Sequence, residues 1–329
     1  MPDEVRFLVV GEALVDVITE GGTTTERPGG SPANVALTLG RLGHHVTLRT
    51  ALGSDRHGIL VSDWLRMSNV RIESVPLTRT STAAAVLGVD GAAAYTFDIE
   101  WPATIDTTSP AEHIHAGSIG AWMAPGADDV ALLVAKHTSA RCAPTVSFDP
   151  NIRPALVDSA EVVRARCDAL AFSSEIIKLS DEDLRWLYPG RSEHSVVTEW
   201  LDAGALVAVV TEGGAGARAY TRGGESVAVP ARVARVVDTI GAGDTFMGAF
   251  LASLGDLGYL GARNRGHLAQ ISAHSLRAAM RRAIDAASVT VSRSGMDPPA
   301  FSEIGTADAY FASHGTPTGL PGGKAASGL

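Results

Sequence analysis

The segment from Asp238 to Phe246, with the sequence DTIGAGDTF, carries the residue types best suited to chemistry. Its two glycines, Gly241 and Gly243, stand one residue apart and allow backbone N–H groups to converge on an anion at the start of a helix. A carboxylate at Asp244 repels such an anion unless it is there to accept a proton from an attacking hydroxyl. We therefore interpret this segment as a phosphoryl-transfer site in which Asp244 is the general base. A glycine-rich turn with Asp244 as a helix N-cap explains the segment equally well when it is taken alone.

A second glycine-rich segment, Gly29-Gly30-Ser31-Pro32-Ala33-Asn34, lies much earlier in the chain. Paired glycines before a helix let a small polar ligand approach the backbone, and Asn34 on the first helical turn offers both a donor and an acceptor. Taken alone, the segment is more typical of an ordinary connection between a loop and a helix. Asp16, near the first apolar run, is either a carboxylate that binds sugar hydroxyls or a solvated strand end.

Short apolar runs alternate with longer amphipathic stretches, and these elements must position both segments. The expected strands are residues 7–11, 45–51, 114–119, 145–148, 176–179 and 206–211. The expected helices are residues 31–43, 56–68, 128–137, 159–171, 181–187, 196–203, 241–254 and 275–292. This alternation predicts an α/β fold with a mostly parallel central sheet and helices on both faces. For the helix 31–43 we expect Ser31 as the N-cap, Pro32 at the first helical position and Gly43 at the stop.

Two hairpins interrupt the alternation. Residues 80–90 and 93–99 are extended runs joined at Asp90-Gly91, a strong hairpin signal, and residues 14–19 form a further run outside the rhythm. We interpret them as a small sheet that forms a lid over a cleft, with an edge hairpin as the alternative. Residues 217–220 and 226–230 predict a second hairpin near the edge of the main sheet.

Composition excludes several classes of protein. The chain has 329 residues, of which 45% are hydrophobic and 19% charged, as in globular proteins. No apolar run approaches the roughly 20 residues of a membrane-spanning helix, and the first residues lack the features of a secretory signal. The net charge of −9 argues against a nucleic-acid or anionic-membrane surface. The two cysteines, Cys142 and Cys167, cannot make a disulfide scaffold, and we expect a reduced, cytoplasmic protein.

Lysine occurs only at Lys136, Lys178 and Lys324, and none of the three completes the pattern G-x-x-x-x-G-K-[ST]. A P-loop is therefore excluded, and any nucleotide must be held by another loop. His113 and His115 face one way on an expected strand, but no third metal ligand lies near them in the sequence, so we interpret them as structural.

The two glycine-rich segments together resemble the two signatures of the ribokinase-like (PfkB-type) carbohydrate kinases. The resemblance runs from about residue 7 to residue 299 and is nearest to the fructokinase and 2-keto-3-deoxygluconate kinase branches. It implies a kinase domain over residues 1–312, with lid segments at about 14–28 and 70–103 and a disordered tail at 313–329. It also implies ATP as the phosphoryl donor and a sugar hydroxyl as the acceptor.

The resemblance assigns roles to individual positions. Asp244 is the general base, and the anion hole is Gly241, Ala242 and Gly243. The sugar contacts are Asp16, Gly29, Gly30 and Asn34. The nucleotide-binding turn is Thr211, Gly213 and Gly216. The positions near the metal and phosphates are Lys178, Ser180 and Asp183. The positions that bind a monovalent cation such as K⁺ in some family members are Asp238, Ile240, Thr290, Arg293 and Gly295.

This chain departs from the family where Asn and Glu often stand, because it has Ser180 and Asp183 there. Mg²⁺ is therefore expected to arrive on the nucleotide, held through water, without a dedicated protein cage. Glu212 is also unusual in a phosphate-binding turn unless its side chain points away.

The segment 148–154 resembles the same two branches, and Arg153 suits a hydroxyl, a carboxylate or a phosphate, with a surface ion pair as the alternative. Phe97 and Trp101 either cover the sugar or pack in the core. These features favour fructose, then 2-keto-3-deoxygluconate, then ribose; a nucleoside kinase and a silent sugar- or nucleotide-binding regulator remain alternatives. The resemblance also makes a homodimer through the lid plausible.

Overall fold

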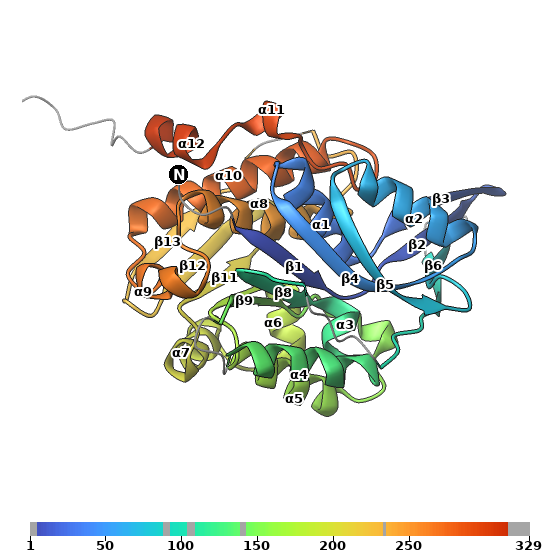
Figure 1. The fold of residues 1–329 in the computed structure, drawn as a ribbon, viewed down its shortest axis with the longest axis horizontal. Helices are drawn as coiled ribbons and strands as arrows, with labels where there is room; N and C mark the ends of the chain where they lie inside the picture. Colours follow the sequence, from blue (N-terminus) through green and yellow to red (C-terminus); the bar gives the residue numbers. More distant parts are fainter. Residues whose placement is uncertain (1–4, 88–92, 104–108, 139–142, 233–234, 315–329) are drawn as a thin grey trace, which may run out of the picture.

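Strand β1 (Arg6–Val10) explains why helices cover the central sheet on both sides. In the computed structural model, which describes residues 5–87, 93–103, 109–138, 143–232 and 235–314, its side chains alternate between two hydrophobic cores. Phe7 and Val9 belong to one core, Leu8 and Val10 to the other, and all four are buried. A strand that is apolar on both faces needs a helical layer over each face. The predicted parallel sheet between two layers of helices is confirmed (Figure 1).

The central sheet has nine strands in the order β13-β12-β11-β10-β9-β8-β1-β4-β5. All neighbouring pairs are parallel except β11 with β12 and β12 with β13, so the predicted second hairpin is confirmed at one edge. The strands of this sheet are β1 (Arg6–Val10), β4 (His45–Gly53), β5 (Val70–Leu77), β8 (His113–Gly117), β9 (Thr145–Asp149), β10 (Ile176–Ser180), β11 (Val207–Thr211), β12 (Ala217–Thr221) and β13 (Ser226–Val229).

Helices α1, α2, α8 and α10 contribute to the first core, and α3 to α7 contribute to the second, on the opposite face of the sheet (Figure 1). The helices of the described chain are α1 (Ser31–Arg41), α2 (Arg56–Arg66), α3 (Ser118–Trp122), α4 (Gly126–Thr138), α5 (Ala160–Ala171), α6 (Asp181–Leu187), α7 (Glu193–Ala203), α8 (Ala242–Asp256), α9 (Arg265–Leu268), α10 (Ala273–Val291), α11 (Phe301–Ile304) and α12 (Ala307–His314).

A second, four-stranded sheet lies beside the central one, in the order β3-β2-β6-β7. Its strands are β2 (Leu14–Glu20), β3 (Thr23–Gly29), β6 (Thr82–Leu87) and β7 (Ala93–Asp98). The predicted pairing of residues 80–90 with 93–99 is confirmed by the antiparallel β6 and β7, although the predicted turn at Asp90-Gly91 lies outside the described residues. The expectation that residues 70–103 form one lid segment is wrong at its start. Strand β5 pairs with β4 over eight residues and completes the central sheet.

The start of helix α1 differs from the prediction. Its N-cap is Gly30, with φ of 100°, and Ser31 is the first helical residue, so Pro32 is the second. Ser31 does not cap the helix because its hydroxyl donates a hydrogen bond to Asp244. The predicted stop is correct, since Gly43 follows the helix with a φ of 90°, where glycine is favoured.

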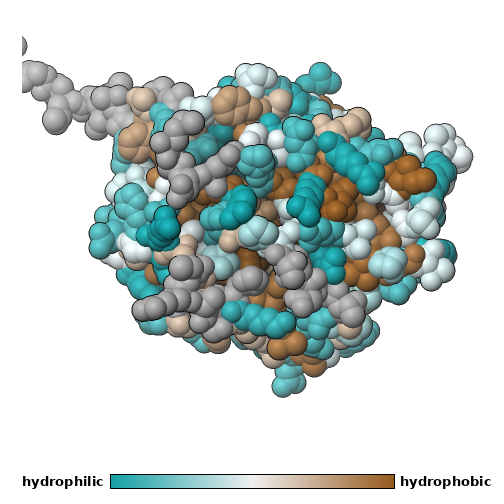
Figure 2. Space-filling model, in the orientation of Figure 1, coloured by the Kyte–Doolittle hydropathy of each residue, from teal (hydrophilic) through white to brown (hydrophobic). Residues whose placement is uncertain are grey.

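At the C-terminal end, α12 continues to His314, two residues into the predicted tail of 313–329; the rest of that tail lies outside the described residues. Within the described ranges, no helix is both long enough and apolar enough to cross a membrane. Figure 2 shows one face of the molecule, on which hydrophobic residues appear between hydrophilic ones.

Candidate active site

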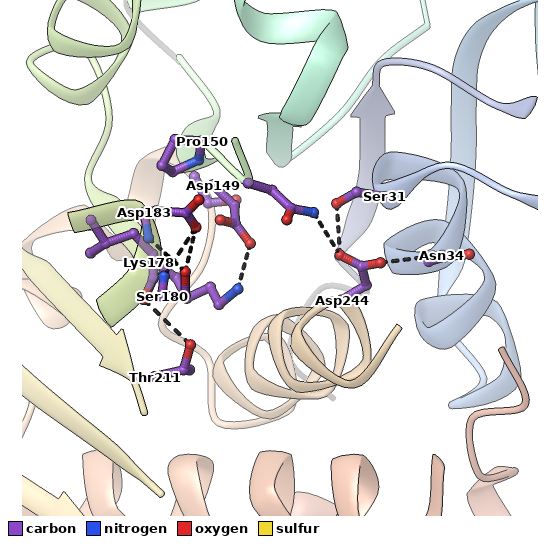
Figure 3. Close-up of polar contacts among 12 residues, drawn as sticks. Ser31, Asn34, Asp149, Pro150, Lys178, Ser180, Asp183, Thr211 and Asp244 are labelled. Atoms are coloured by element: carbon purple, nitrogen blue, oxygen red, sulfur yellow. Dashed lines mark hydrogen bonds and ion pairs between the residues drawn. The ribbon is translucent and has the colours of Figure 1, made fainter. Parts of the chain in front are cut away.

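Asp244 is the third residue of helix α8 and is 6% exposed. Its Oδ1 accepts a hydrogen bond from Ser31 Oγ at 2.7 Å, and its Oδ2 accepts one from Asn34 Nδ2 at 2.7 Å (Figure 3). Asn151 Nδ2 donates a longer bond to Oδ1 at 3.3 Å. The alternative in which Asp244 is an N-cap is wrong, because Gly241 is the N-cap and the Asp244 carboxylate faces helix α1.

Close packing of α1 against α8 brings these groups together. Gly248 makes the approach possible, since a Cβ on it would lie 2.7 Å from Thr38 Cβ. Directly after Asp244 in the chain, Thr245 Oγ1 lies 2.9 Å from Thr290 Oγ1 and ties α8 to α10. The carboxylate is thus placed by two helices rather than by a flexible loop, which gives it one defined orientation.

A cavity of about 620 Å³ opens in front of Asp244. Most of the predicted sugar-binding residues line it, namely Asp16, Gly30, Asn34, Phe97 and Arg153, together with the predicted anion hole of Gly241, Ala242 and Gly243. Gly29 is not part of the lining, but it lies directly behind Asp16, where a Cβ would stand 2.4 Å from Asp16 Oδ2. Trp101 is buried and donates to the Gly120 carbonyl at 3.0 Å, so it packs in the core.

A second cavity, of about 510 Å³, is lined by Thr211, Gly213 and Gly216, as the resemblance implied for the nucleotide. Thr239, Ala242 and Gly243 line both cavities. The first turn of α8 therefore lies where the two cavities meet, with the N–H groups of a helix N-terminus at the junction. Such groups stabilise negative charge.

Glu212 does not line this second cavity. Its carboxylate accepts a hydrogen bond from Arg218 Nη2 at 2.8 Å, which neutralises its charge beside the glycine-rich turn. The side chain thus turns away from the cavity.

Two carboxyl groups in the first cavity have unusual pKa values. Burial raises the pKa of Asp16 to about 6, with the charge of Asp244 adding to the rise and Arg153 opposing it. Burial also raises the pKa of Glu12 to about 7, while a hydrogen bond from the Gly120 N–H at 2.9 Å opposes that rise. Sequence reasoning missed Glu12. Its position just after a parallel strand, where ligands bind in open α/β sheets, is the signal that could have found it.

Two residues with a positive φ also line the cavity. Ser118 has φ of 54° and Asn151 has φ of 36°, and they follow strands β8 and β9. Side chains other than glycine adopt such values rarely and mostly where the surroundings enforce them, often at functional sites. The α3 turn that begins at Ser118 was not predicted, since residues 114–119 read as one strand.

Lys178 forms a buried ion pair with Asp149, with 2.7 Å between Nζ and Oδ2 (Figure 3). Burial is the largest single influence and lowers the pKa of Lys178, but the charge and hydrogen bond of Asp149, together with the charges of Asp244 and Asp183, outweigh it and raise the pKa. The ammonium lies next to the anion-hole turn, 3.2 Å from where a Cβ on Gly243 would be.

Ser180 and Asp183 line neither cavity. They form a capping box at the start of α6, and Asp183 Oδ1 accepts a hydrogen bond from the Ile152 N–H at 2.8 Å. Asp183 therefore holds the loop that carries Asn151 and Arg153. Its two oxygens are engaged in these bonds, and no cluster of three metal-binding side chains occurs in the described ranges.

The positions implied for a monovalent cation lie on two adjacent segments. Asp238 Oδ1 accepts from the Ile240 N–H at 3.0 Å, and its Oδ2 accepts from the Gly295 N–H at 2.9 Å. Thr290 contacts Thr245, as described above, whereas the Arg293 side chain pairs with Glu303. The structure thus joins the loop before α8 to the loop after α10.

His113 and His115 are buried, and both ring nitrogens of His113 and Nδ1 of His115 bond with the hydroxyls of Thr145 and Ser147 at 2.8–2.9 Å. Burial lowers the pKa of both, that of His115 to about 3, so they are neutral packing groups of the sheet. Cys167 is buried as well, and burial raises the pKa of its thiol; Cys142 lies outside the described residues.

Comparison with known proteins shows that the sequence and the fold of this chain are similar to those of sugar kinases. The model of the pfkB family of carbohydrate kinases matches residues 6–302. A fructokinase from Rhizobium leguminosarum bv. trifolii is 35% identical over 262 residues, which cover 75% of this chain and 79% of that protein. A fructokinase from Klebsiella pneumoniae is 32% identical over 262 residues, which cover 76% and 84%. The crystal structure of a fructokinase from Xylella fastidiosa with bound ATP matches with a TM-score of 0.78 at 25% identity, over 93% of this chain and 97% of that one.

Proposed function

This chain belongs to the pfkB family of carbohydrate kinases and is an ATP-dependent sugar kinase, and from that premise we propose that it phosphorylates a primary hydroxyl of fructose. The observation that carries the proposal is the position of Asp244. Its carboxylate lines the first cavity beside the helix turn that the second cavity shares. A base on the acceptor side of an anion-binding turn is the arrangement that phosphoryl transfer to an alcohol requires.

In the proposed reaction, the sugar occupies the first cavity with its hydroxyl toward Asp244. The carboxylate takes the hydroxyl proton while the oxygen attacks the γ-phosphorus of ATP and the bond to the β-phosphate oxygen breaks. N–H groups of residues 241–243 stabilise the transferring group, and the Lys178 ammonium, paired with Asp149, lies beside Gly243. Ser31 and Asn34 hold the carboxylate in place through the bonds they donate.

For the other ligand groups, we propose that Asp16, Asn34 and Arg153 bind the sugar hydroxyls and that the small sheet acts as the lid. The turn at Thr211, Gly213 and Gly216 holds the nucleotide. Mg²⁺ enters with ATP and neutralises phosphate charge, which suits a chain whose Asp183 is occupied by hydrogen bonds. A monovalent cation such as K⁺ would be held by backbone carbonyls of the joined loops 238–240 and 290–295. The homodimer through the lid stays a prediction.

A second acceptor, 2-keto-3-deoxygluconate, is favoured by one observation. Arg153 lines the cavity, and a guanidinium pairs well with a carboxylate. A coupled assay of ADP formation with Mg²⁺ and ATP separates the candidates: fructose, 2-keto-3-deoxygluconate, ribose and adenosine are each offered as acceptor. The highest kcat/KM with fructose supports the proposal. A preference for another acceptor reassigns the substrate, and silence with every acceptor favours the binding regulator.

We expect Asp244→Asn to lower kcat by about 10²–10⁴ and to change KM modestly, because the amide cannot accept the proton. Asp55→Asn is the matched control, since Asp55 caps helix α2 and lies outside both cavities. Because Asn caps a helix about as well as Asp, this variant should lose only the hydrogen bond that Asp55 Oδ2 accepts from the Thr80 N–H, which is worth about 1 kcal/mol, and kcat should be unchanged. Full turnover by a folded Asp244→Asn enzyme would remove Asp244 from the mechanism.

A further inference from the structure

Arg27 lies on strand β3 of the small sheet, directly opposite Asp16 on strand β2. Residues opposite one another in an antiparallel pair project from the same face. Asp16 lines the proposed sugar cavity, and the positive charge of Arg27 lowers the Asp16 pKa as a lesser contribution. The strand pair therefore places a proposed sugar-binding carboxylate and a cation side by side.

The Arg27 side chain extends from the small sheet to the loop before α8 and the loop after α10, which are the two joined loops described above. Its Nη1 lies 3.4 Å from Asp238 Oδ2, and its Nη2 donates to Ser294 Oγ at 3.0 Å. Gly295 leaves room for this contact, because a Cβ there would be 2.9 Å from Arg27 Nη1. One guanidinium thus bridges residues that are far apart in the sequence.

Asp238 connects this bridge to the chemistry. Its other oxygen, Oδ1, accepts from the Ile240 N–H at 3.0 Å and so fixes the loop that leads into Gly241. Thr239, inside that loop, lines both cavities. A shift of Asp238 would therefore move the backbone that precedes the anion-hole turn.

We propose that Arg27 is a positioning residue that makes the geometry of the anion-hole turn depend on the position of the small sheet. The proposal rests on the proposed function. With sugar bound at Asp16 and the sheet in place, Arg27 holds Asp238 and the turn is set for transfer to the sugar. Without this link, the turn is less well ordered and the cavity admits water, so more ATP is hydrolysed without sugar phosphorylation.

The chain offers a matched control on the neighbouring residue. Glu26 of the same strand pairs with Arg56 of helix α2, with 2.5 Å between Oε2 and Nη2. That pair also tethers the small sheet to the large domain, but it does not touch either joined loop. The Arg27 side chain is 38% exposed and that of Arg56 is 81% exposed, and exposed ion pairs contribute little to stability, so neither variant should unfold.

The experiment compares Arg27→Met, Arg27→Lys and Arg56→Met with the wild type in one assay that measures both ADP and sugar phosphate. We expect Arg27→Met to lower kcat for the sugar about 10-fold with less than about 3-fold change in KM, and to raise the ratio of ADP to sugar phosphate above one. Arg27→Lys should be intermediate, because an ammonium keeps the charge but lacks the fork that reaches Ser294. Arg56→Met should match the wild type.

Equal kcat and equal product ratios in Arg27→Met and Arg56→Met would overturn the inference. A wild-type enzyme that phosphorylates no sugar would instead overturn the proposed function, so the two failures are distinguishable.

A double-mutant cycle with Asp238→Asn tests whether Arg27 acts through Asp238. The loss in kcat should not increase when Asp238→Asn is combined with Arg27→Met, whereas additive losses would mean that Arg27 does not act through Asp238.

Discussion

Asp244 and Asp16 are two carboxylates in one cavity with different surroundings. Asp244 accepts hydrogen bonds from Ser31, Asn34 and Asn151. For Asp16, the dominant influence is burial, and its pKa rises to about 6. Pairs of titratable groups with different environments are how an active site divides roles between similar residues. The roles follow from position: Asp244 directly follows the turn that both cavities share, as a base must, whereas Asp16 lines only the first cavity, as a binding group would.

The raised pKa of Asp16 has a direct consequence for the pH profile. An ordinary Asp is ionised above about pH 4, but Asp16 becomes protonated as the pH falls through about 6 and then accepts hydrogen bonds poorly. We expect kcat/KM for the sugar to fall about 10-fold per pH unit below that value. Asp16→Asn should lower kcat/KM at neutral pH and abolish this acid limb.

Glu12→Gln is the control for that profile, because Glu12 lines the same cavity and its pKa is raised to about 7. If the limb disappears in Glu12→Gln and persists in Asp16→Asn, the assignment to Asp16 is wrong.

The sequence predicted the site residues that belong to a motif of recognisable residue types and spacing. It did not predict the roles that residues acquire through tertiary contacts. Asp244 and Asn34 belong to glycine-rich segments and could be named in advance. Ser31 was taken for a helix cap, and its real partner, Asp244, is 213 residues away. Asp183 was predicted near the phosphates, which stays a prediction, and its bond from the Ile152 N–H, by which it also holds the loop at Asn151, was not foreseen.

At the level of elements, the contact between α1 and α8 decides the geometry of the site. Helix α1 carries Ser31 and Asn34, and helix α8 carries Asp244. Gly248 lies at the contact, where a Cβ would meet Thr38 Cβ at 2.7 Å and the Val35 carbonyl at 3.1 Å. Both neighbours are parts of a buried helix and cannot move aside easily.

We expect Gly248→Ala to destabilise the protein by about 1–3 kcal/mol despite the better helix propensity of alanine, because the two helices must separate. It should also lower kcat, since Asp244 moves away from Ser31 and Asn34. Urea unfolding together with steady-state kinetics measures both effects. Gly266→Ala is the control, as Gly266 is a helical glycine with no atom within 4 Å of its Cβ position. Equal stability of the two variants would show that the helix contact tolerates a methyl group.

The elements themselves were largely predictable, because apolar periodicity distinguishes strands from helices. The pairing of the strands was less so. Strand β5 was assigned to the lid, since its sequence does not reveal that Val70 lies beside Val46 of β4. The short helix α3 was missed because Ile119 and Ala121 continue the apolar run of β8, and only the positive φ at Ser118 ends the strand.

On the scale of the whole molecule, strand order was beyond sequence reasoning. Strand β1 lies between β8 and β4. The three strands end at Val10, Gly117 and Gly53, and the segments that follow them therefore begin at the same edge of the sheet. This crossover brings Glu12, Ser118 and the loop at Asn151 around one cavity. A single sequence shows which segments are strands. The placement of β1 between β8 and β4 depends instead on how the helices pack on the two faces of the sheet.

The meeting of the two cavities at Thr239, Ala242 and Gly243 governs the stereochemistry of the reaction. A donor on one side of a helix turn and an acceptor on the other approach phosphorus from opposite directions, so a single in-line displacement should invert its configuration. Adenosine triphosphate made chiral at the γ-phosphorus with oxygen isotopes would yield a sugar phosphate of opposite handedness. Retention of configuration would mean that a protein side chain is phosphorylated first and then transfers the phosphoryl group to the sugar. The arrangement of the two cavities therefore predicts inversion of configuration at the transferred phosphorus.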